Sequence, residues 1–470
     1  ADNELNWLDL ARASGASVPE GLENCTPHGV YAVYRHGTRY PSDGDILEVQ
    51  DVIDRLQGSN INPDFYHLRD AVRIPLANAS QLAESGWKEM RQLAGRVKTR
   101  WPQLFPDQDV ALDKYAFQST GKPRTIDSAR GYIEGVVGLH QSCGTQFAER
   151  SFTVECSEDG GSATPTSTTV PHDPTDNDPL LRFYDLYEDC TLAVNGGRTE
   201  MERGGFLNGP EMERVWQRVS QRLAEPGASP WTISRDEIVT LTKMCGYDRT
   251  LYNDTSSWCT LFNTEDLYAP EYHSGMKDYW TSSYGFSINY RISCTLAQDV
   301  LDYLQRRVTS PAQTPLGTFK FAHSDTVIPV LSLLGLFNDP LPLMASNFQA
   351  NAERRFRSAN VAPFAGNVAF ALYECSSNRT DDVTHRVQVL HNESPVQLDF
   401  CGGQFCTLRE FRAGLELAIG ACDFKEECAA AMNDRTTKQP GSGATINFSV
   451  CIQLILAYIA FIVLSFVRSS

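Results

Sequence analysis

The sequence is short of positive charge. Its 470 residues carry 41 Lys and Arg against 58 Asp and Glu, which gives a formal net charge of −17. This balance argues against nucleic acid as a partner, because a phosphate backbone attracts basic surfaces. The sequence also lacks Cys-x-x-Cys pairs with metal-ligand spacing and lacks an internal repeat. A chain of this length is expected to divide into two or more lobes.

A long apolar run is missing until residues 450–467, which are just long enough to cross a bilayer. Residues 431–449 are predicted to be a linker, and small residues at 440–444 within it precede this run. The combination is typical of a lipid-anchor signal, and a retained single span is the alternative. Ala1 opens a polar stretch without a signal peptide, so we expect the numbering to begin after its removal. These features predict a membrane partner at the C-terminus.

The cysteines and sequons predict the secretory pathway and the cell surface. Twelve of the 13 cysteines precede residue 450 and are scattered, which favours disulfides over the alternative of cytosolic free thiols. Cys422 and Cys428 are close enough in sequence for a local bridge. Five predicted glycosylation sites point the same way; they are Asn24, Asn78, Asn253, Asn378 and Asn392.

One stretch carries the strongest chemical signal. The apolar run 30–34 is predicted to be a buried strand, which Gly37 and Pro41 then end. His36 therefore lies at the carboxyl end of a strand, between Arg35 and Arg39. An imidazole can attack phosphorus, and guanidinium groups match phosphate oxygens, so the pattern predicts phosphoryl transfer. The alternative is an ordinary surface turn.

Two later stretches have the same form, a short strand followed by polar residues. After the strand-like run 115–118, Arg124 falls at the start of a predicted helix, where anions bind; the alternative is a surface arginine. After the apolar run 319–322, His323 and Asp325 could supply a phosphate ligand and a proton donor. Alternatively, Asp325 only caps the next helix. The basic cluster 354–357 fits a solvated face or a rim that attracts anions.

The order of elements predicts an α/β fold with a doubly wound open sheet and an inserted, mainly α-helical cap. Strand patterns lie near both ends of the chain, and 368–373 is another, while helical patterns fill the middle. We place the catalytic α/β domain at 25–135 and 286–430 and the cap at 136–285. The Ser-, Thr-, Pro- and Gly-rich residues 157–179 are predicted to be a flexible insertion.

These motifs resemble the histidine acid phosphatase family, in its multiple inositol polyphosphate phosphatase branch. The resemblance spans roughly residues 25 to 430, and five further stretches carry the similarity to this branch: 177–185, 278–285, 293–296, 329–335 and 356–358. It implies a phosphomonoesterase without metal or other cofactor. The implied substrates are inositol hexakisphosphate (phytate), lower inositol phosphates and 2,3-bisphosphoglycerate.

The resemblance also implies a role for each site residue. His36 becomes the phosphorylated nucleophile, and the phosphate ligands are Arg35, Arg39, Arg124 and His323. The branch typically has His-Ala-Glu where this chain has His323-Ser324-Asp325, so we expect Asp325, with a shorter side chain, to donate the proton. A binding or adhesion protein with weak catalysis and a mutase-like enzyme are the alternatives.

Overall fold

The computed structural model describes residues 25–105, 112–138, 143–148, 151–156, 166–171, 178–376 and 383–438. Within these ranges the fold is mixed α/β, with a central seven-stranded sheet in the order β10-β8-β7-β1-β6-β2 and β9 beside β8. Its strands are β1 (Cys25–Arg35), β2 (Tyr115–Ser119), β6 (Gly317–Ala322), β7 (Asn367–Ser376), β8 (Val383–His391), β9 (Ser394–Val396) and β10 (Phe405–Thr407).

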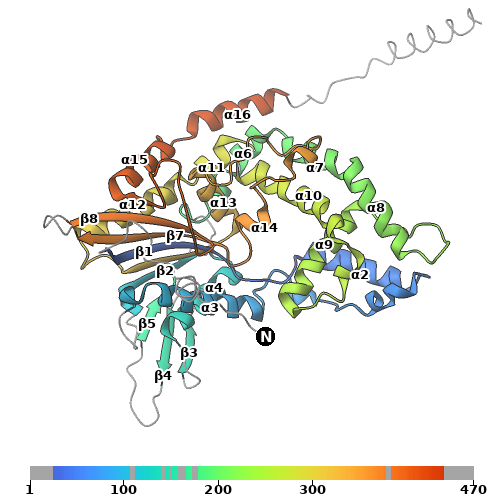
Figure 1. The fold of residues 1–470 in the computed structure, drawn as a ribbon, viewed down its shortest axis with the longest axis horizontal. Helices are drawn as coiled ribbons and strands as arrows, with labels where there is room; N and C mark the ends of the chain where they lie inside the picture. The colour runs from blue at the N-terminus through green and yellow to red at the C-terminus, as the bar shows by residue number, and fades with distance from the viewer. Residues whose placement is uncertain are drawn as a thin grey trace, which may run out of the picture.

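Helices cover both faces of this sheet (Figure 1). One face carries α3 (Glu84–Arg100) and α4 (Pro123–Val137), and the other carries α12 (Cys294–Thr309), α13 (Ser324–Leu333) and α15 (Leu408–Ile419). Along β1 the side chains alternate between two cores: Val30 and Tyr34 pack with α3 and α4, while Tyr31 and Val33 pack on the opposite side. Burial on both faces explains the continuous apolar run that predicted this strand.

A helical lobe lies beside the sheet (Figure 1). It contains α2 (Asp43–Gln57), α5 (Phe183–Leu186), α6 (Glu188–Asn195), α7 (Arg198–Leu207), α8 (Pro210–Leu223), α9 (Arg235–Tyr247), α10 (Thr264–Ser282) and α11 (Ser287–Arg291). Helices α9 and α10 begin in capping boxes, in which Ser234 pairs with Glu237 and Asn263 with Asp266. Helices α14 (Ser358–Val361) and α16 (Lys425–Lys438) complete the described chain.

A small antiparallel sheet lies between α4 and α5 in the chain. It joins β3 (Cys143–Ala148), β4 (Ser151–Cys156) and β5 (Thr166–Thr169). Strand β5 falls within the predicted insertion 157–179 and pairs with β4, and the flexible insertion stays a prediction. Residues 157–165 and 172–177 lie outside the described residues.

Disulfides tie distant parts of the chain together. The structure pairs Cys25–Cys375, Cys190–Cys428, Cys245–Cys259, Cys294–Cys422 and Cys401–Cys406. The suggested local bridge between Cys422 and Cys428 was wrong, because Cys422 pairs with Cys294 on α12 and Cys428 pairs with Cys190 on α6.

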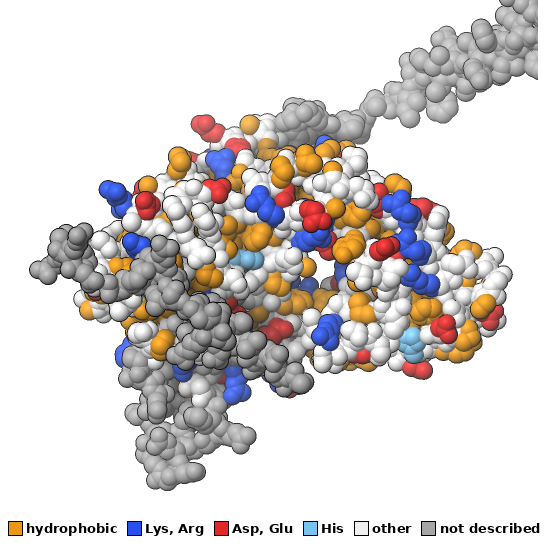
Figure 2. All heavy atoms as spheres, viewed as in Figure 1, with side chains coloured by type: hydrophobic (Ala, Val, Ile, Leu, Met, Phe, Trp, Pro, Cys, Tyr) orange, Lys and Arg blue, Asp and Glu red, His pale blue; other side chains and the backbone are white. Residues whose placement is uncertain are grey.

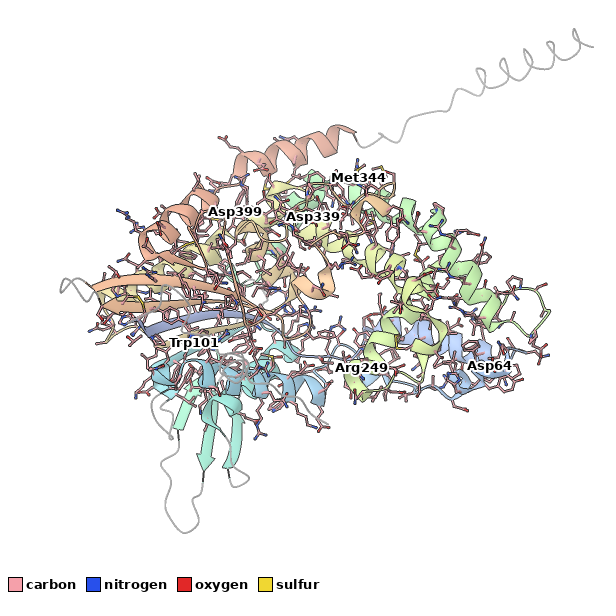
Figure 3. All side chains as sticks on the ribbon, in the orientation of Figure 1. Asp64, Trp101, Arg249, Asp339, Met344 and Asp399 are labelled. Carbon is pink, nitrogen blue, oxygen red and sulfur yellow. A yellow bond between two sulfur atoms is a disulfide. The ribbon has the colours of Figure 1, made fainter. Side chains whose placement is uncertain are left out.

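Trp101, which Figure 3 labels, lies beneath the sheet. Its indole N–H donates a hydrogen bond to the hydroxyl of Tyr373 at 3.0 Å.

Candidate active site

The carboxyl ends of three parallel strands meet at one edge of the sheet. β1 pairs with β6 so that Arg35 lies opposite Ala322, and β6 pairs with β2 so that Phe321 lies opposite Ser119. The residues that follow these strands are therefore neighbours in space, although up to about 290 positions separate them in the sequence. The backbone N–H of His36 donates to the carbonyl of Ala322 at 3.0 Å, which joins two of the three strand ends.

His36 is buried, with 3 % of its surface exposed. Its Nδ1 lies 2.9 Å from the carbonyl oxygen of Gly37, and a carbonyl can only accept a hydrogen bond. Nδ1 therefore carries the proton, and the lone pair of the neutral ring lies on Nε2. Burial, followed by the charge of Arg35, holds the pKa of His36 well below its usual value. The imidazole stays neutral, as a nucleophile must be.

His323 follows β6 and is the N-cap residue of α13. Its ring centroid lies 5.6 Å from that of His36. Arg124, at the start of α4, approaches Nδ1 of His323 with one guanidinium nitrogen at 3.4 Å, and Nε2 of His323 lies 3.0 Å from the hydroxyl of Thr120. An arginine only donates, so Nδ1 accepts and Nε2 carries the proton. Burial and the Arg124 charge lower the pKa of His323 well below its usual value.

Three arginines, Arg35 and Arg39 of the motif and Arg124 of α4, surround the two histidines. Arg35 donates to the carbonyl of Ala362 at 2.5 Å, and its guanidinium carbon lies 4.6 Å from the centre of the Phe364 ring. Burial and the charge of Arg39 lower the pKa of Arg35 to about 10. The same two causes, burial first, lower the pKa of Arg124. In the described chain, the Nε atoms of Arg35 and Arg124 are buried without a hydrogen-bond partner. An oxyanion would satisfy these donors.

Asp325 lies in the first turn of α13, half-buried. It does not cap this helix, because His323 is the N-cap residue and no side chain there accepts a capping hydrogen bond. Instead, Oδ1 of Asp325 accepts a hydrogen bond from Ser282 at 3.3 Å. The negative charge of Asp325 partly opposes the lowering of the Arg35 and Arg124 pKa values that burial causes. The carboxyl group therefore faces the cationic side chains.

Asp278 is a second carboxyl group near the site, and the motif analysis did not assign it a role. It lies one turn before Ser282 on α10, so both residues share the helix face that meets Asp325. Burial, followed by the charge of Asp325, raises the pKa of Asp278. The stretch 278–285 contributed to the resemblance but gave Asp278 no role, and the packing of α10 on α13 brings this residue to the site.

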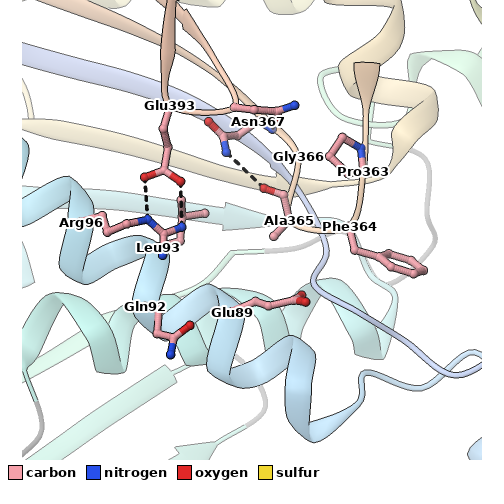
Figure 4. Close-up of a pocket in the computed structure, with 11 residues that line it drawn as sticks. Glu89, Gln92, Leu93, Arg96, Pro363, Phe364, Ala365, Gly366, Asn367 and Glu393 are labelled. Atoms are coloured by element: carbon pink, nitrogen blue, oxygen red, sulfur yellow. Dashed lines mark hydrogen bonds and ion pairs between the residues drawn. The ribbon is translucent and has the colours of Figure 1, made fainter. Parts of the chain in front are cut away.

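Helix α3 contacts the motif through Glu89 and Gly86. Both oxygens of Glu89 are engaged by Thr38, at 2.8 Å to its backbone nitrogen and 2.6 Å to its hydroxyl oxygen. Gly37 and Gly86 touch, and a Cβ on Gly37 would lie 2.4 Å from the Gly86 carbonyl oxygen. A cavity of about 280 Å³ lies next to this contact. Its lining includes Glu89 and the 363–367 loop, which Figure 4 draws. That loop bonds the motif backbone through Ala365 and Gly366.

The space-filling view is hollowed between the sheet lobe and the helical lobe, and Lys and Arg side chains lie on the border of this hollow (Figure 2).

The basic cluster 354–357 is not a simple solvated face. Arg354 is only 7 % exposed, and both Arg354 and Arg357 form ion pairs with Glu271. Phe356 of this cluster is buried in the core.

The remaining predicted residues lie away from the site or outside the described residues. Asn253 is exposed, Asn78 is half-buried, and the Asn392 side-chain amide donates to the carbonyl of Asn360 at 3.0 Å. Asn24, Asn378, the residues 439–449 of the predicted linker and the apolar run 450–467 fall outside the described ranges. None of the helices within those ranges combines the length and apolar character that a bilayer crossing needs.

Comparison with known proteins places this site in a family. Residues 28–392 match the family model of the histidine phosphatase superfamily (branch 2). The chain is 31% identical over 413 residues to multiple inositol polyphosphate phosphatase 1 of Gallus gallus, covering 86% of this chain and 84% of the relative. It is 30% identical over 442 residues to the Homo sapiens protein of the same name, covering 90% and 85%.

Solved structures share the fold. The multiple inositol polyphosphate phosphatase of Bifidobacterium longum, in complex with inositol hexasulfate, aligns with a TM-score of 0.63 at 17% identity, over 86% of this chain and 94% of that one. The phytase from D. castellii aligns with a TM-score of 0.66 at 15% identity, over 91% and 92%. None of these matches supports the alternative of an adhesion protein. The chain belongs to the histidine phosphatase superfamily (branch 2), and within it to the multiple inositol polyphosphate phosphatases.

Proposed function

We propose that the protein hydrolyses inositol polyphosphates, from inositol hexakisphosphate to lower inositol phosphates, through a phosphohistidine at His36. The observation that carries this proposal is the meeting of three strand ends. It brings the His36 ring to 5.6 Å from the ring of His323, which Arg124 contacts at 3.4 Å. The names of the relatives in Gallus gallus and Homo sapiens support the same substrate class. 2,3-Bisphosphoglycerate is a second proposed substrate.

In the first step, the arginines Arg35, Arg39 and Arg124, together with His323, bind the phosphoryl oxygens and neutralise their charge. Nε2 of His36 attacks phosphorus as the bond to the ester oxygen breaks. The leaving oxygen takes the proton of Asp325, since an alkoxide is a poor leaving group. The Nδ1 proton stays on its hydrogen bond to Gly37, which fixes the orientation of the ring.

In the second step, water attacks the phosphohistidine. The Asp325 carboxylate accepts a proton from this water, the bond between phosphorus and Nε2 breaks, and the lone pair returns to His36. Inorganic phosphate leaves, and Asp325 is protonated again for the next cycle. No metal ion or other cofactor enters either step.

The test is the product ladder from inositol hexakisphosphate, resolved by ion chromatography. We expect the protein to release phosphates one after another and the variant His36→Ala to release none. His67→Ala is the matched control, because this exposed histidine bonds only Thr260 in the described chain and lies outside the site. Equal hydrolysis by His36→Ala and the control would refute the proposed nucleophile.

We propose the catalytic unit 25–135 with 286–430 and the cap 136–285 as the two lobes. Helix α2, which belongs to the range 25–135, contacts helix α9 of the cap. In α2, Asp45 pairs with Lys243 at 2.9 Å, and Glu48 accepts from Thr240 at 2.5 Å, both on α9. These contacts join helix α2, which belongs to the first range of the catalytic unit, to the cap.

We also propose that the protein passes through the secretory pathway and is held at the cell surface by a lipid anchor that replaces residues 450–467. The five disulfides of the described cysteines support an oxidising compartment. Among the sequons, Asn253 is the best candidate for a glycan because it is exposed. A phospholipase specific for inositol-glycan anchors should release the protein from membranes, whereas a retained span should resist it.

A further inference from the structure

A second cluster of ligating side chains lies at the other end of β1, on three adjacent strands. His28 is on β1, Glu374 on β7 and His385 on β8, and Glu374 lies directly opposite His385 in the ladder. The pairing of β1 with β7 shifts register between Pro27 and Gly29, so His28 is the extra residue of a bulge. A bulge turns a side chain from its normal direction, and here it brings the His28 ring to the other two.

The three side chains are spaced like metal ligands. Nδ1 of His28 lies 3.4 Å from Oε2 of Glu374, and Nε2 of His385 lies 3.8 Å from the same oxygen. All three ligand atoms lie within 4.8 Å of one another. Bonds of ~2.0–2.1 Å in a tetrahedral zinc site place its ligand atoms about 3.3 Å apart. The two distances to Glu374 exceed this spacing by at most about 0.5 Å, and the two histidine nitrogens, within 4.8 Å of each other, would close by up to about 1.5 Å around an ion.

The hydrogen bonding of His28 leaves its Nδ1 available for an ion. Nε2 of His28 lies 2.9 Å from the carbonyl oxygen of Arg307, so Nε2 carries the proton and donates it. In the neutral ring the Nδ1 lone pair then faces a carboxylate oxygen, and two acceptors at 3.4 Å repel unless a proton or a metal ion lies between them. A second ring nitrogen that donates to a backbone carbonyl is also typical of histidines that bind metals.

The neighbouring Arg307 does not provide this cation. The guanidinium of Arg307 donates to backbone carbonyls of His28, Pro311 and Thr314 instead of to Glu374. The side chains are 18 %, 43 % and 16 % exposed for His28, Glu374 and His385, which gives an ion and its completing water a route from solvent.

We propose that His28, Glu374 and His385 bind one divalent transition-metal ion, best matched by Zn²⁺, with water completing the coordination. Two imidazoles and a carboxylate form a donor set that suits zinc. Eight residues of extended chain separate His28 from His36, roughly 25 Å. The ion is therefore structural and joins β1, β7 and β8 next to the Cys25–Cys375 disulfide.

The experiment titrates Zn²⁺ into the chelator-treated full chain by calorimetry and records the melting temperature with and without the ion. We expect one Zn²⁺ per chain, a higher melting temperature with zinc, and unchanged hydrolysis of p-nitrophenyl phosphate after chelation. At a free concentration of 100 times Kd, the unfolding equilibrium constant should fall about 100-fold. Glu374→Gln and His385→Gln should each weaken binding by at least about 100-fold, and His67→Gln should not.

Hydrolysis of p-nitrophenyl phosphate by the two variants shows that they fold, since the cluster lies far from the catalytic residues. Binding of equal affinity in the protein and in Glu374→Gln would place the ion elsewhere and overturn the inference. A chain that binds no zinc at micromolar concentrations would overturn it too, leaving only an ion pair between a protonated histidine and Glu374.

Discussion

The contact between the motif and helix α3 gives a prediction whose size follows from the structure. A Cβ on Gly86 would lie 2.1 Å from the carbonyl oxygen and 2.6 Å from the backbone nitrogen of Thr38. An ordinary contact begins at 3.4 Å, so Gly86→Ala must separate helix and motif by about 1.3 Å. Overpacking of this kind costs ~1–3 kcal/mol, and we expect the upper end because both opposing atoms are backbone.

This displacement would move Thr38, which lies two positions after the nucleophile His36. Because a misplacement of ~1 Å can cost about 100-fold in rate, we expect kcat on inositol hexakisphosphate to fall by about that factor. Gly95→Ala is the matched control, since this glycine lies on the same helix with nothing within 4 Å of its Cβ position. Alanine there should stabilise the protein by ~0.5–1 kcal/mol, because it lowers the entropy lost in the helix.

The assay measures melting temperature and kcat for both variants. If Gly86→Ala matches Gly95→Ala in both quantities, helix α3 does not position the motif and the reasoning fails.

Two further predictions concern proton transfer and pH. Asp325→Asn should slow hydrolysis of inositol hexakisphosphate by ~10²–10⁴-fold but affect p-nitrophenyl phosphate much less, because nitrophenolate leaves without a proton. If Asp278→Asn shows this pattern instead, the donor is Asp278. Arg35→Gln removes a charge that lowers the pKa of His36, so this pKa should rise. Since only neutral imidazole attacks, the acidic side of the pH profile of kcat/KM should move to higher pH in this variant. If the profile does not move, the ionisation of His36 does not determine its acidic side.

The sequence predicted the chemistry of the site because that chemistry is local. The strands that end at Arg35, Ser119 and Ala322 each have an apolar run followed by polar residues, and parallel pairing brings such ends together. The roles proposed for His36 and His323 need only this rule and the resemblance. The mixed α/β fold also follows from the order of strands and helices along the chain.

Features that depend on packing could not be predicted. Asp278 reaches the site only because α10 lies against α13, and Glu89 engages Thr38 only because two glycines let α3 approach the motif. The partners of Cys422 and Cys428 follow from where α6 and α12 lie, which sequence spacing does not give. The His28 cluster depends on one extra residue in a strand, a register shift without a local signal.

The central claim is that a ring nitrogen of His36 carries the phosphoryl group. The most direct measurement is a rapid acid-free quench of the protein during turnover of inositol hexakisphosphate labelled with ³²P, followed by peptide mapping under alkaline conditions, where phosphohistidine persists. The account predicts label on the peptide that contains His36 and none in His36→Ala. Turnover without label on that peptide, or label on another residue, would contradict it.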